Sequence, residues 1–532
     1  MIKFKTKIIK LGLVILCFIY SSHTFAEQQR LQTKNPDDKS ILKKAKGLLM
    51  LDYEKISLKG GGDFDFLGVH YLHQMNDWLY FGVGISGPIL EGDYGGFFVV
   101  DTTLHAKKRV FGNWYVDAGL AFGGGGGGAS VKNIKKLSGS GRYLKKYLGI
   151  GYKINDNYFG INYANVSISD SLIDDSVINF YYQKPLSFSI GSYADAGGKF
   201  ARTNFRYRDY DSILSFELNN MSQIKPTGSY GGDIGLVSPQ FSQFFSNSDY
   251  LFFGFDLGYS GLDFYNQIHG GIGHRVSVSP KINLYGQLGI GTGGWVTDTI
   301  QTGPGLLVYP KVKAEYLWDK DIGLSISAGY LAAPKGTSKN WTVGAGINYH
   351  FSAGKPGSSN VDADYDLAMK GFRVSIFHNT LFDINHNGEK VDNVNMETLQ
   401  VDYMLSDHVY VPFQIGAATN DYKGYAGYVE MFTGLGWQSS YLDSEKLQGF
   451  AQLLFGINDV GVNEQEDVGP LLNASIGFNY SLSKQLAIYV QMGKTVSVNK
   501  YIKSNYSNYF RDSSIGLGIT YRFSLPTRAS RL

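Results

Sequence analysis

Apolar and polar residues alternate with a period of two along most of the chain. In 515–523 the odd positions are apolar or aromatic, and the even positions are Gly, Thr or Arg. The segments 79–86, 322–330 and 341–351 alternate in the same way. This pattern is typical of a β-strand with one apolar and one polar face, because successive side chains of a strand point to opposite sides. The alternation therefore predicts an all-β protein.

The placement of aromatic residues favours a membrane barrel over a soluble β-fold. The chain contains 38 Tyr and 34 Phe, many of them at the ends of alternating segments, as in the interfacial girdles of transmembrane barrels. A helical membrane protein would instead need runs of about 20 apolar residues. An open sheet cannot cross lipid, because its edge N–H and C=O groups would lack partners. We therefore predict a closed antiparallel barrel, with a soluble propeller or solenoid as the alternative.

Short polar turns recur in three sets, which indicates three repeats of about 165 residues. The sets are 76–77, 248–249 and 406–407; 111–113, 280–281 and 444–446; and 156–157, 320–321 and 484–485. Each repeat closes with a related strand, at 178–182, 346–351 and 518–523. We expect about eight strands in each repeat, with short periplasmic turns and longer extracellular loops. The expected loops are 123–141, 224–247, 291–304, 457–469 and 497–513.

Three repeats could close as one wide barrel of about 24 strands or as tandem smaller barrels, for example of 16 and 8 strands. Segment 178–182 runs through Gln183-Lys184-Pro185 directly into 186–190, which leaves room only for a tight turn within one sheet. The Gly-, Ser- and Asp-rich segment 352–370 could be a linker or a long turn. We expect the single barrel, because each small barrel would have to seal its own edges.

The N-terminus predicts export from the cytoplasm. Four lysines precede the apolar stretch 11–20, and 24–26 offers a cleavage site after Ala26, although an uncleaved anchor is the alternative. The single cysteine, Cys17, follows Leu16, where lipoprotein processing needs a small residue. The mature chain would therefore contain no cysteine and form no disulfide. Without the four signal lysines the formal charge falls from +3 to −1, which gives no argument for nucleic-acid binding.

These patterns divide the chain into consecutive segments. The predicted order is a signal peptide (1–26), an N-terminal periplasmic segment (27–48), barrel repeat 1 (49–185), barrel repeat 2 (186–351), a linker or long turn (352–370), barrel repeat 3 (371–523) and a C-terminal tail (524–532).

Each predicted repeat resembles the small outer-membrane barrels of Gram-negative bacteria, such as the OmpA transmembrane domain and the lipid A deacylase family. The resemblance implies an outer-membrane location and insertion by the barrel-assembly machinery, because 515–523 resembles the signal that this machinery reads. That signal usually ends the chain, whereas 524–532 follow it here. Lipid A deacylases carry a His two residues before the catalytic Ser, and Asn165 stands there before Ser167. The resemblance therefore implies no enzyme and no catalytic residues.

Other local motifs are better explained by structure than by ligand binding. The glycine run 123–128 lacks the Lys, Ser or Thr and helix of a phosphate loop, which leaves a flexible loop or a close backbone approach. Segment 383–388 matches half of a calcium loop, but Val394 stands where a Glu is required, and an Asn-Gly hairpin explains the same residues. His70 and His73 have no third ligand nearby for zinc. We predict no cofactor and no metal site, and the ligand-binding residues are unknown.

Two functions remain open on the sequence. The inward faces are expected to carry Gly, Ser, Thr, Asn and Gln without a repeated inward charge, which favours a channel for a polar, largely uncharged solute or polymer such as exopolysaccharide. Small inward residues would equally let a narrow barrel pack, which favours a non-channel adhesin or scaffold acting through its extracellular loops. The expected partners are outer-membrane lipid and lipopolysaccharide, whose phosphates a basic cluster within 132–146 would face.

Overall fold

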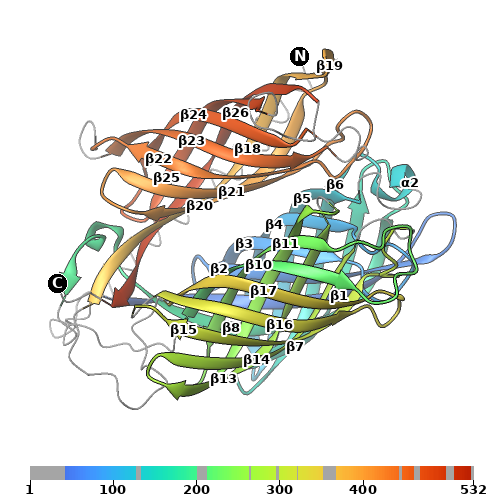
Figure 1. Cartoon of the computed structure of the whole chain (residues 1–532), viewed down its shortest axis with the longest axis horizontal. Helices are drawn as coiled ribbons and strands as arrows, with labels where there is room; N and C mark the ends of the chain where they lie inside the picture. The colour runs from blue at the N-terminus through green and yellow to red at the C-terminus, as the bar shows by residue number, and fades with distance from the viewer. Residues whose placement is uncertain are drawn as a thin grey trace.

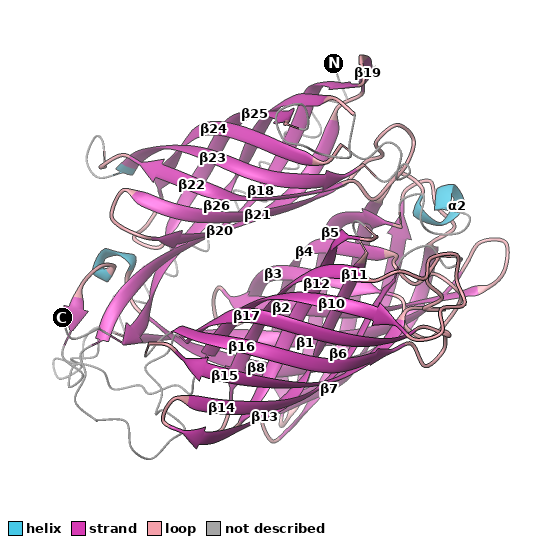
Figure 2. Cartoon of the chain, viewed as in Figure 1, coloured by secondary structure: helices cyan, strands magenta, loops and turns pink. Residues whose placement is uncertain are grey.

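The computed structural model describes residues 42–127, 134–200, 212–262, 265–294, 299–319, 322–350, 367–441, 446–460, 468–498 and 508–528. These residues form three closed antiparallel barrels in one chain (Figure 1), and most of them lie in strands (Figure 2). The predicted all-β class is confirmed. In the same ranges no helix has both the length and the apolar character needed to span a bilayer.

The first barrel contains eight strands and closes by pairing of its first strand with its last. Its strands are β1 (Lys43–Ser57), β2 (Asp63–Gln74), β3 (Leu79–Gly87), β4 (Phe98–Phe111), β5 (Trp114–Gly126), β6 (Arg142–Ile154), β7 (Asn157–Ile168) and β8 (Asp174–Ile190). A short helix, α2 (Ile134–Ser138), lies in the connection between β5 and β6.

The second barrel closes by pairing of β10 with β17. Its strands are β10 (Ser212–Gln223), β11 (Ile234–Phe244), β12 (Asp249–Ser260), β13 (Asn266–Ser279), β14 (Ile282–Gly294), β15 (Leu306–Leu317), β16 (Ile322–Ala332) and β17 (Lys339–His350). Between β8 and β10 the chain forms a 3-10 turn, η2 (Tyr193–Asp195), and the short strand β9 (Lys199–Phe200).

The third barrel closes by pairing of β18 with β26. Its strands are β18 (Leu367–His386), β20 (Val394–Met404), β21 (Val409–Ala418), β22 (Val429–Gln438), β23 (Leu447–Asp459), β24 (Pro470–Ser481), β25 (Leu486–Ser497) and β26 (Phe510–Arg528). The short strand β19 (Glu389–Val391) folds back on the end of β18.

The three closures correct the expectation of one barrel of about 24 strands. The alternative of tandem smaller barrels is confirmed, with three barrels of eight strands in place of the example of 16 and 8. Each unit satisfies its own edges because its first and last strands match in length and apolar pattern. Tyr53 of β1, for example, lies opposite Phe180 of β8. The edge groups thus find partners inside the unit, and a wider sheet is not required.

The joint after the first repeat is a continuous strand, where a tight turn was expected. β8 runs through Gln183-Lys184-Pro185 to Ile190 and stays paired with β1, with Pro185 opposite Leu48. Pairing between β7 and β8 stops at Gln183. Pro185 therefore lies where β8 has a neighbour on one side only, which a residue without an N–H tolerates. Residues 186–190 accordingly belong to the first barrel.

Other predicted boundaries also shift. β1 begins inside the predicted periplasmic segment, and β26 continues to Arg528 inside the predicted tail. β11 occupies much of the expected loop 224–247. The sequence did not predict this strand, because its Val, Pro and Phe alternate with polar residues over only a short stretch. The predicted signal peptide lies outside the described residues, as does most of the segment 352–370.

The predicted turns lie at equivalent places in the three barrels. Turns 76–77, 248 and 406–407 follow the second strand of each barrel, and 112–113 and 280–281 follow the fourth. We call the end that holds these turns the short-turn end, and the opposite end the long-loop end. Gly191 pairs with Ser524 at the short-turn ends of the first and third barrels. Gly95 donates a hydrogen bond to Gly303 at the long-loop ends of the first and second. All three barrels therefore point the same way.

Close contacts join the barrels into a ring. A Cβ on Gly124 of β5 would lie 1.8 Å from the Ala418 carbonyl oxygen of the third barrel. Thr292 of β14 donates a hydrogen bond to the Pro88 carbonyl oxygen in the first barrel. Ile457 of β23 packs on the apolar cluster of the second barrel. In each case the fifth strand of one barrel contacts a second barrel, near the connection between the third and fourth strands of that second barrel. A repeated head-to-tail contact of this kind closes into a ring.

Candidate functional site: the barrel lumens and the outer wall

The lumen of the first barrel is filled by buried charged side chains. Lys145 forms ion pairs with both Asp52 and Glu54. His70 lies between Asp52, at 3.4 Å, and Asp101, at 3.3 Å. A second polar layer, nearer the short-turn end, consists of His105, Lys107, Asp117, Tyr147, Tyr181 and Gln183. The side chains of both layers contact one another across the barrel and occupy its interior.

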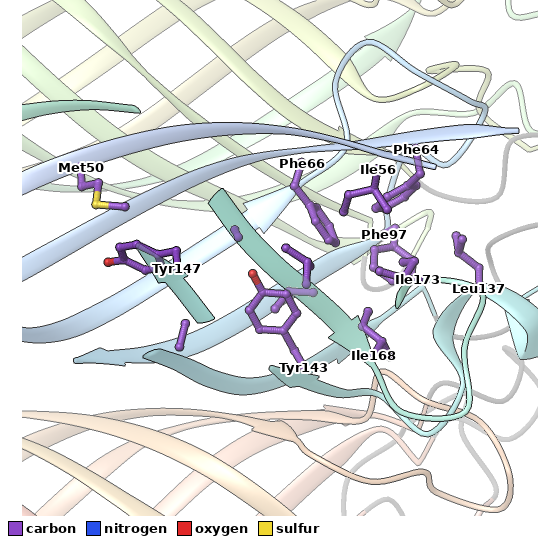
Figure 3. Close-up of a cluster of buried hydrophobic side chains, with 14 of the residues drawn as sticks. Met50, Ile56, Phe64, Phe66, Phe97, Leu137, Tyr143, Tyr147, Ile168 and Ile173 are labelled. Carbon is purple, nitrogen blue, oxygen red and sulfur yellow. The ribbon is translucent and has the colours of Figure 1, made fainter. Parts of the chain in front are cut away.

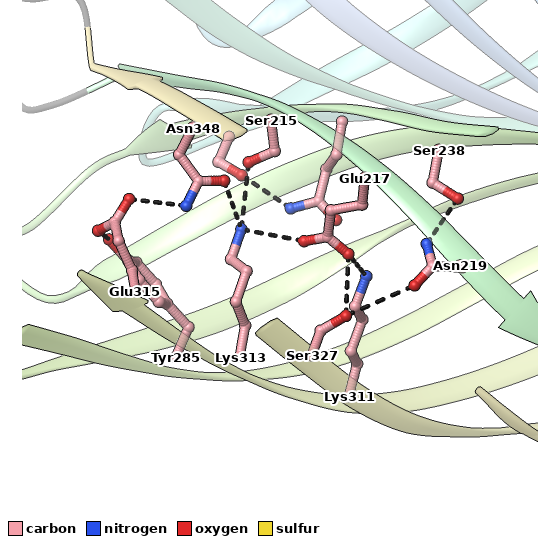
Figure 4. A network of polar contacts seen from close by, with 12 residues as sticks. Ser215, Glu217, Asn219, Ser238, Tyr285, Lys311, Lys313, Glu315, Ser327 and Asn348 are labelled. Atoms are coloured by element: carbon pink, nitrogen blue, oxygen red, sulfur yellow. Dashed lines mark hydrogen bonds and ion pairs between the residues drawn. The ribbon is translucent and has the colours of Figure 1, made fainter. Parts of the chain in front are cut away.

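A comparable network crosses the second barrel (Figure 4). Glu217 accepts a hydrogen bond from Lys311 at 2.5 Å and lies 3.7 Å from Lys313. Lys313 also donates to Asn348 at 3.4 Å, and Asn348 donates to Glu315 at 2.7 Å. The chain of contacts thus runs between opposite walls. An eight-stranded barrel has an interior just wide enough for such side chains to fill it.

The third barrel contains an arginine-centred network. Arg373 and Asp402 form an ion pair at 2.9 Å, and Arg373 donates to Gln438 at 2.5 Å. Gln400 donates to Asp402 at 2.8 Å and to Gln452 at 3.3 Å. Arg373 and Asp402 are almost completely buried, so each charge depends on the other for compensation.

These networks correct the expected neutral lumen. Inward positions carry Asp, Glu, Lys, Arg and His in addition to the predicted amides and hydroxyls. The charges differ from barrel to barrel, so no repeated inward position stands out along the sequence. Lys145 belongs to the basic cluster predicted to face lipopolysaccharide, but it points into the first lumen. Buried opposite charges pair with each other, and they do not form a ring of one sign that would select ions.

Apolar side chains close the long-loop end of each lumen. In the first barrel, loop residues pack on strand residues such as Phe64 and Phe66 (Figure 3). The loop residues that enter the three clusters are Leu58, Leu137 and Ile173; Leu262, Tyr265 and Ile300; and Tyr422, Val460 and Val468. The described loop residues therefore fold over the barrel ends and cover the lumens there.

The connection after β8 lies against the short-turn end of the third barrel. Gly197 donates a hydrogen bond to the Met369 carbonyl oxygen, and Ser524 donates to the Ser192 carbonyl oxygen. Tyr193 of η2 accepts a hydrogen bond from Gln438, a residue of the arginine network. Burial raises the pKa of the Tyr193 hydroxyl above its ordinary value. This connection therefore covers the third lumen at its short-turn end, opposite the apolar cluster at the long-loop end.

The outer wall is apolar where it faces away from the other barrels. Large side chains such as Leu148, Ile178 and Ile326 are more than half exposed, at 62, 69 and 67%. Trp78, Trp114, Trp318 and Trp437 lie near the short-turn rim, and each is partly or largely exposed. Exposure of so much apolar surface marks a membrane or partner surface. Tryptophan at one rim matches the aromatic girdle of membrane barrels.

The other motifs noted in the sequence lie at three separate places in the structure. The glycine run begins inside β5, where Gly124 and Gly126 admit the third barrel, so the close-approach interpretation is confirmed for the described part of the run. Asn387 and Gly388 form the turn between β18 and β19, with positive φ of 55° and 88°. His70 points into the lumen, whereas the ring of His73 packs on Tyr521 outside it, at 5.0 Å.

Asn165 and Ser167, the two positions compared with the lipid A deacylases, form hydrogen bonds to neighbouring strands of the first barrel. The Asn165 amide donates to Ser176, and Ser167 donates to a backbone carbonyl oxygen. Within the described ranges, no three His, Cys, Asp or Glu side chains gather closely enough to hold a metal ion.

Comparison with known proteins gives no family. No family model and no curated protein matches the chain. Solved structures that it resembles include the siderophore receptor PirA from Pseudomonas aeruginosa (9% identity, TM-score 0.26, covering 90% of this chain and 80% of that one). OpdQ from the same organism has 10% identity and a TM-score of 0.20, covering 91% of this chain and 98% of that one. A de novo designed transmembrane β-barrel has 17% identity and a TM-score of 0.19, covering 29% of this chain and 94% of that one. Similarity this low carries no conclusion about activity.

Proposed function

We propose that the protein is an outer-membrane scaffold or adhesin, in which three closed barrels hold a composite surface of loops at the cell exterior. One observation carries the proposal: each lumen is filled by a polar network across its middle and is covered by apolar loop residues at the long-loop end. A lumen occupied in this way leaves the loops as the part of the molecule that can act.

The outer wall supports placement in the membrane. The exposed apolar side chains and the tryptophan rim suit lipid contact, and the common direction of the barrels lets all three cross one bilayer. The short turns would then face the periplasm and the long loops the exterior. Lipid, lipopolysaccharide and the barrel-assembly machinery are the corresponding partners. A shift in gel migration between boiled and unboiled samples tests this placement, and identical migration would contradict it.

A channel for a polar, largely uncharged solute or exopolysaccharide is the competing function. In the first barrel it would require Lys145 to leave both Asp52 and Glu54, because these groups span the lumen. Separation of a buried ion pair leaves uncompensated charge and costs about 3–5 kcal/mol. The geometry therefore favours the closed form.

Conductance of the purified, folded protein in planar bilayers separates the two functions. We expect no stable open level at neutral pH. The variant Glu217→Ala with Lys311→Ala removes side chains that block the second lumen, so it should leak more than the parent protein. A large, stable conductance of the parent protein would refute the scaffold proposal.

A further inference from the structure

The third lumen contains a buried, oxygen-rich layer near its long-loop end that none of the described basic residues neutralises. Glu430 of β22 and Asn458 of β23 are cross-strand neighbours. The Tyr428 hydroxyl donates to Glu430 at 2.6 Å and accepts a hydrogen bond from the Asn458 amide at 3.1 Å. These three side chains are buried and point inward.

Asp512 enters the same layer from β26, on the other side of the barrel. Its side chain is 1% exposed. Neither of its carboxylate oxygens accepts a hydrogen bond of good geometry, although the Thr495 hydroxyl and N–H lie beside it. The Asp512 carboxyl group lies close enough to Glu430 and Tyr428 to interact electrostatically with both. The side-chain amide oxygen (Oδ1) of Asn458 is also buried without a hydrogen-bond donor among the described residues.

The other two barrels neutralise the carboxylates in their lumens. Lys145 lies between Asp52 and Glu54 in the first. In the second, Lys311 neutralises Glu217. Among the described residues, no Lys, Arg or His acts on Glu430 or Asp512. Two buried carboxyl groups that interact electrostatically with no basic residue beside them either take up a proton or bind a cation.

We propose that this layer binds a hard divalent cation of the Ca²⁺ type, with Glu430 and Asp512 as charged ligands and the Asn458 carbonyl oxygen as a neutral one. Carboxylate and amide oxygens are the ligands that Ca²⁺ prefers, and it accepts six to eight of them in irregular geometry. Among the described residues, no donor makes a hydrogen bond of good geometry to the Asp512 carboxylate or to the Asn458 side-chain oxygen, so their lone pairs are available to a cation. The long-loop end would face the exterior, where this cation is available.

Such an ion would link β22, β23 and β26 directly under the apolar cluster of Tyr422, Val460 and Phe510. It would therefore stabilise the loop end of the third barrel, whereas Lys145 and Lys311 play the corresponding role in the other two. The inference concerns the stability of one barrel, and it holds whether the whole protein is a scaffold or a channel.

Terbium luminescence on the folded, full-length protein tests the site directly. Tb³⁺ replaces Ca²⁺ at oxygen sites, and Tyr428 beside the ligands would transfer excitation energy to it. We expect saturable emission that Ca²⁺ displaces. Glu430→Gln and Asp512→Asn should each weaken Tb³⁺ binding about tenfold or more, since each removes a ligand charge.

The variant Glu389→Gln serves as the matched control, because Glu389 is an exposed carboxylate on the same barrel, paired with Lys423. This substitution should leave the emission unchanged. A second measurement, the temperature at which the compact gel form disappears, should rise with Ca²⁺ for the parent protein but not for Asp512→Asn. Absence of saturable emission from the parent protein would overturn the proposal. A calcium-independent gain in stability from Asp512→Asn would also overturn it, because it would indicate a shared proton.

Discussion

The ion pair of Arg373 and Asp402 allows the closed-lumen account to be tested quantitatively. Arg373→Met removes the positive charge and leaves the Asp402 carboxylate, which is 1% exposed, with the hydrogen bond from Gln400 at 2.8 Å. Removing one partner of a buried ion pair costs about 3–5 kcal/mol. Because Gln400 retains part of the compensation, we expect a loss near the lower value, about 3 kcal/mol.

The loss should appear in the thermal unfolding of the third barrel. For a unit of this size, 1 kcal/mol corresponds to a shift of about 2–4 °C, so the midpoint should fall by about 6–12 °C. The assay is the temperature at which the compact form disappears on gels, checked by urea unfolding in lipid vesicles.

A double variant separates the pair from the packing around it. Arg373→Met with Asp402→Leu replaces both charges by apolar groups and should lie within about 1 kcal/mol of the parent protein. Arg373 also stacks on Tyr410 at 4.3 Å, and both variants lose that contact. If the single and double variants lose the same stability, Asp402 is not buried beside Arg373, and the described lumen is wrong.

Two further substitutions test the ring and the hairpin. Gly124→Leu should separate the third barrel from the first, because the new side chain would collide with the Ala418 carbonyl oxygen. Limited proteolysis should then cut between these barrels. The control Gly286→Ala, with no atom within 4 Å of the new Cβ, should behave like the parent protein. Gly388→Ala should lower the stability of the third barrel by about 1 kcal/mol, because φ there is 88°, and urea unfolding that shows no loss would exclude this turn geometry.

Local alternation and turn chemistry were enough to predict many of the strands and several of the turns between them. The period-two pattern of 515–523 lies within β26, and Asn387-Gly388 forms the hairpin turn that its sequence favours. These features depend on neighbouring residues, and they can therefore be read from one sequence.

Closure and the lumen contents depend on residues far apart in the chain. Nothing near Pro185 indicates that β8 continues past it, because the reason is its pairing with β1. Likewise, Lys145 resembles a loop lysine until β6 brings it beside Asp52. The inward charges could have been suspected from acidic or basic residues at the polar positions of strands, such as Glu217 and Lys311, since a charge facing lipid is costly.

Closure of each unit on itself is the central claim, because a wide barrel would enclose one wide lumen, whereas polar side chains cross each of three narrow ones. Disulfide trapping tests it, and the predicted mature chain has no cysteine to interfere. Cysteines at Leu51 and Tyr182 should crosslink β1 to β8, as should those at Leu214 and Tyr349 for β10 to β17, since these residues are paired. A cysteine at Ile178 should not crosslink to one at Leu214, Phe216 or Leu218 of β10. Crosslinking between β8 and β10, with none between β1 and β8, would contradict the three-barrel architecture.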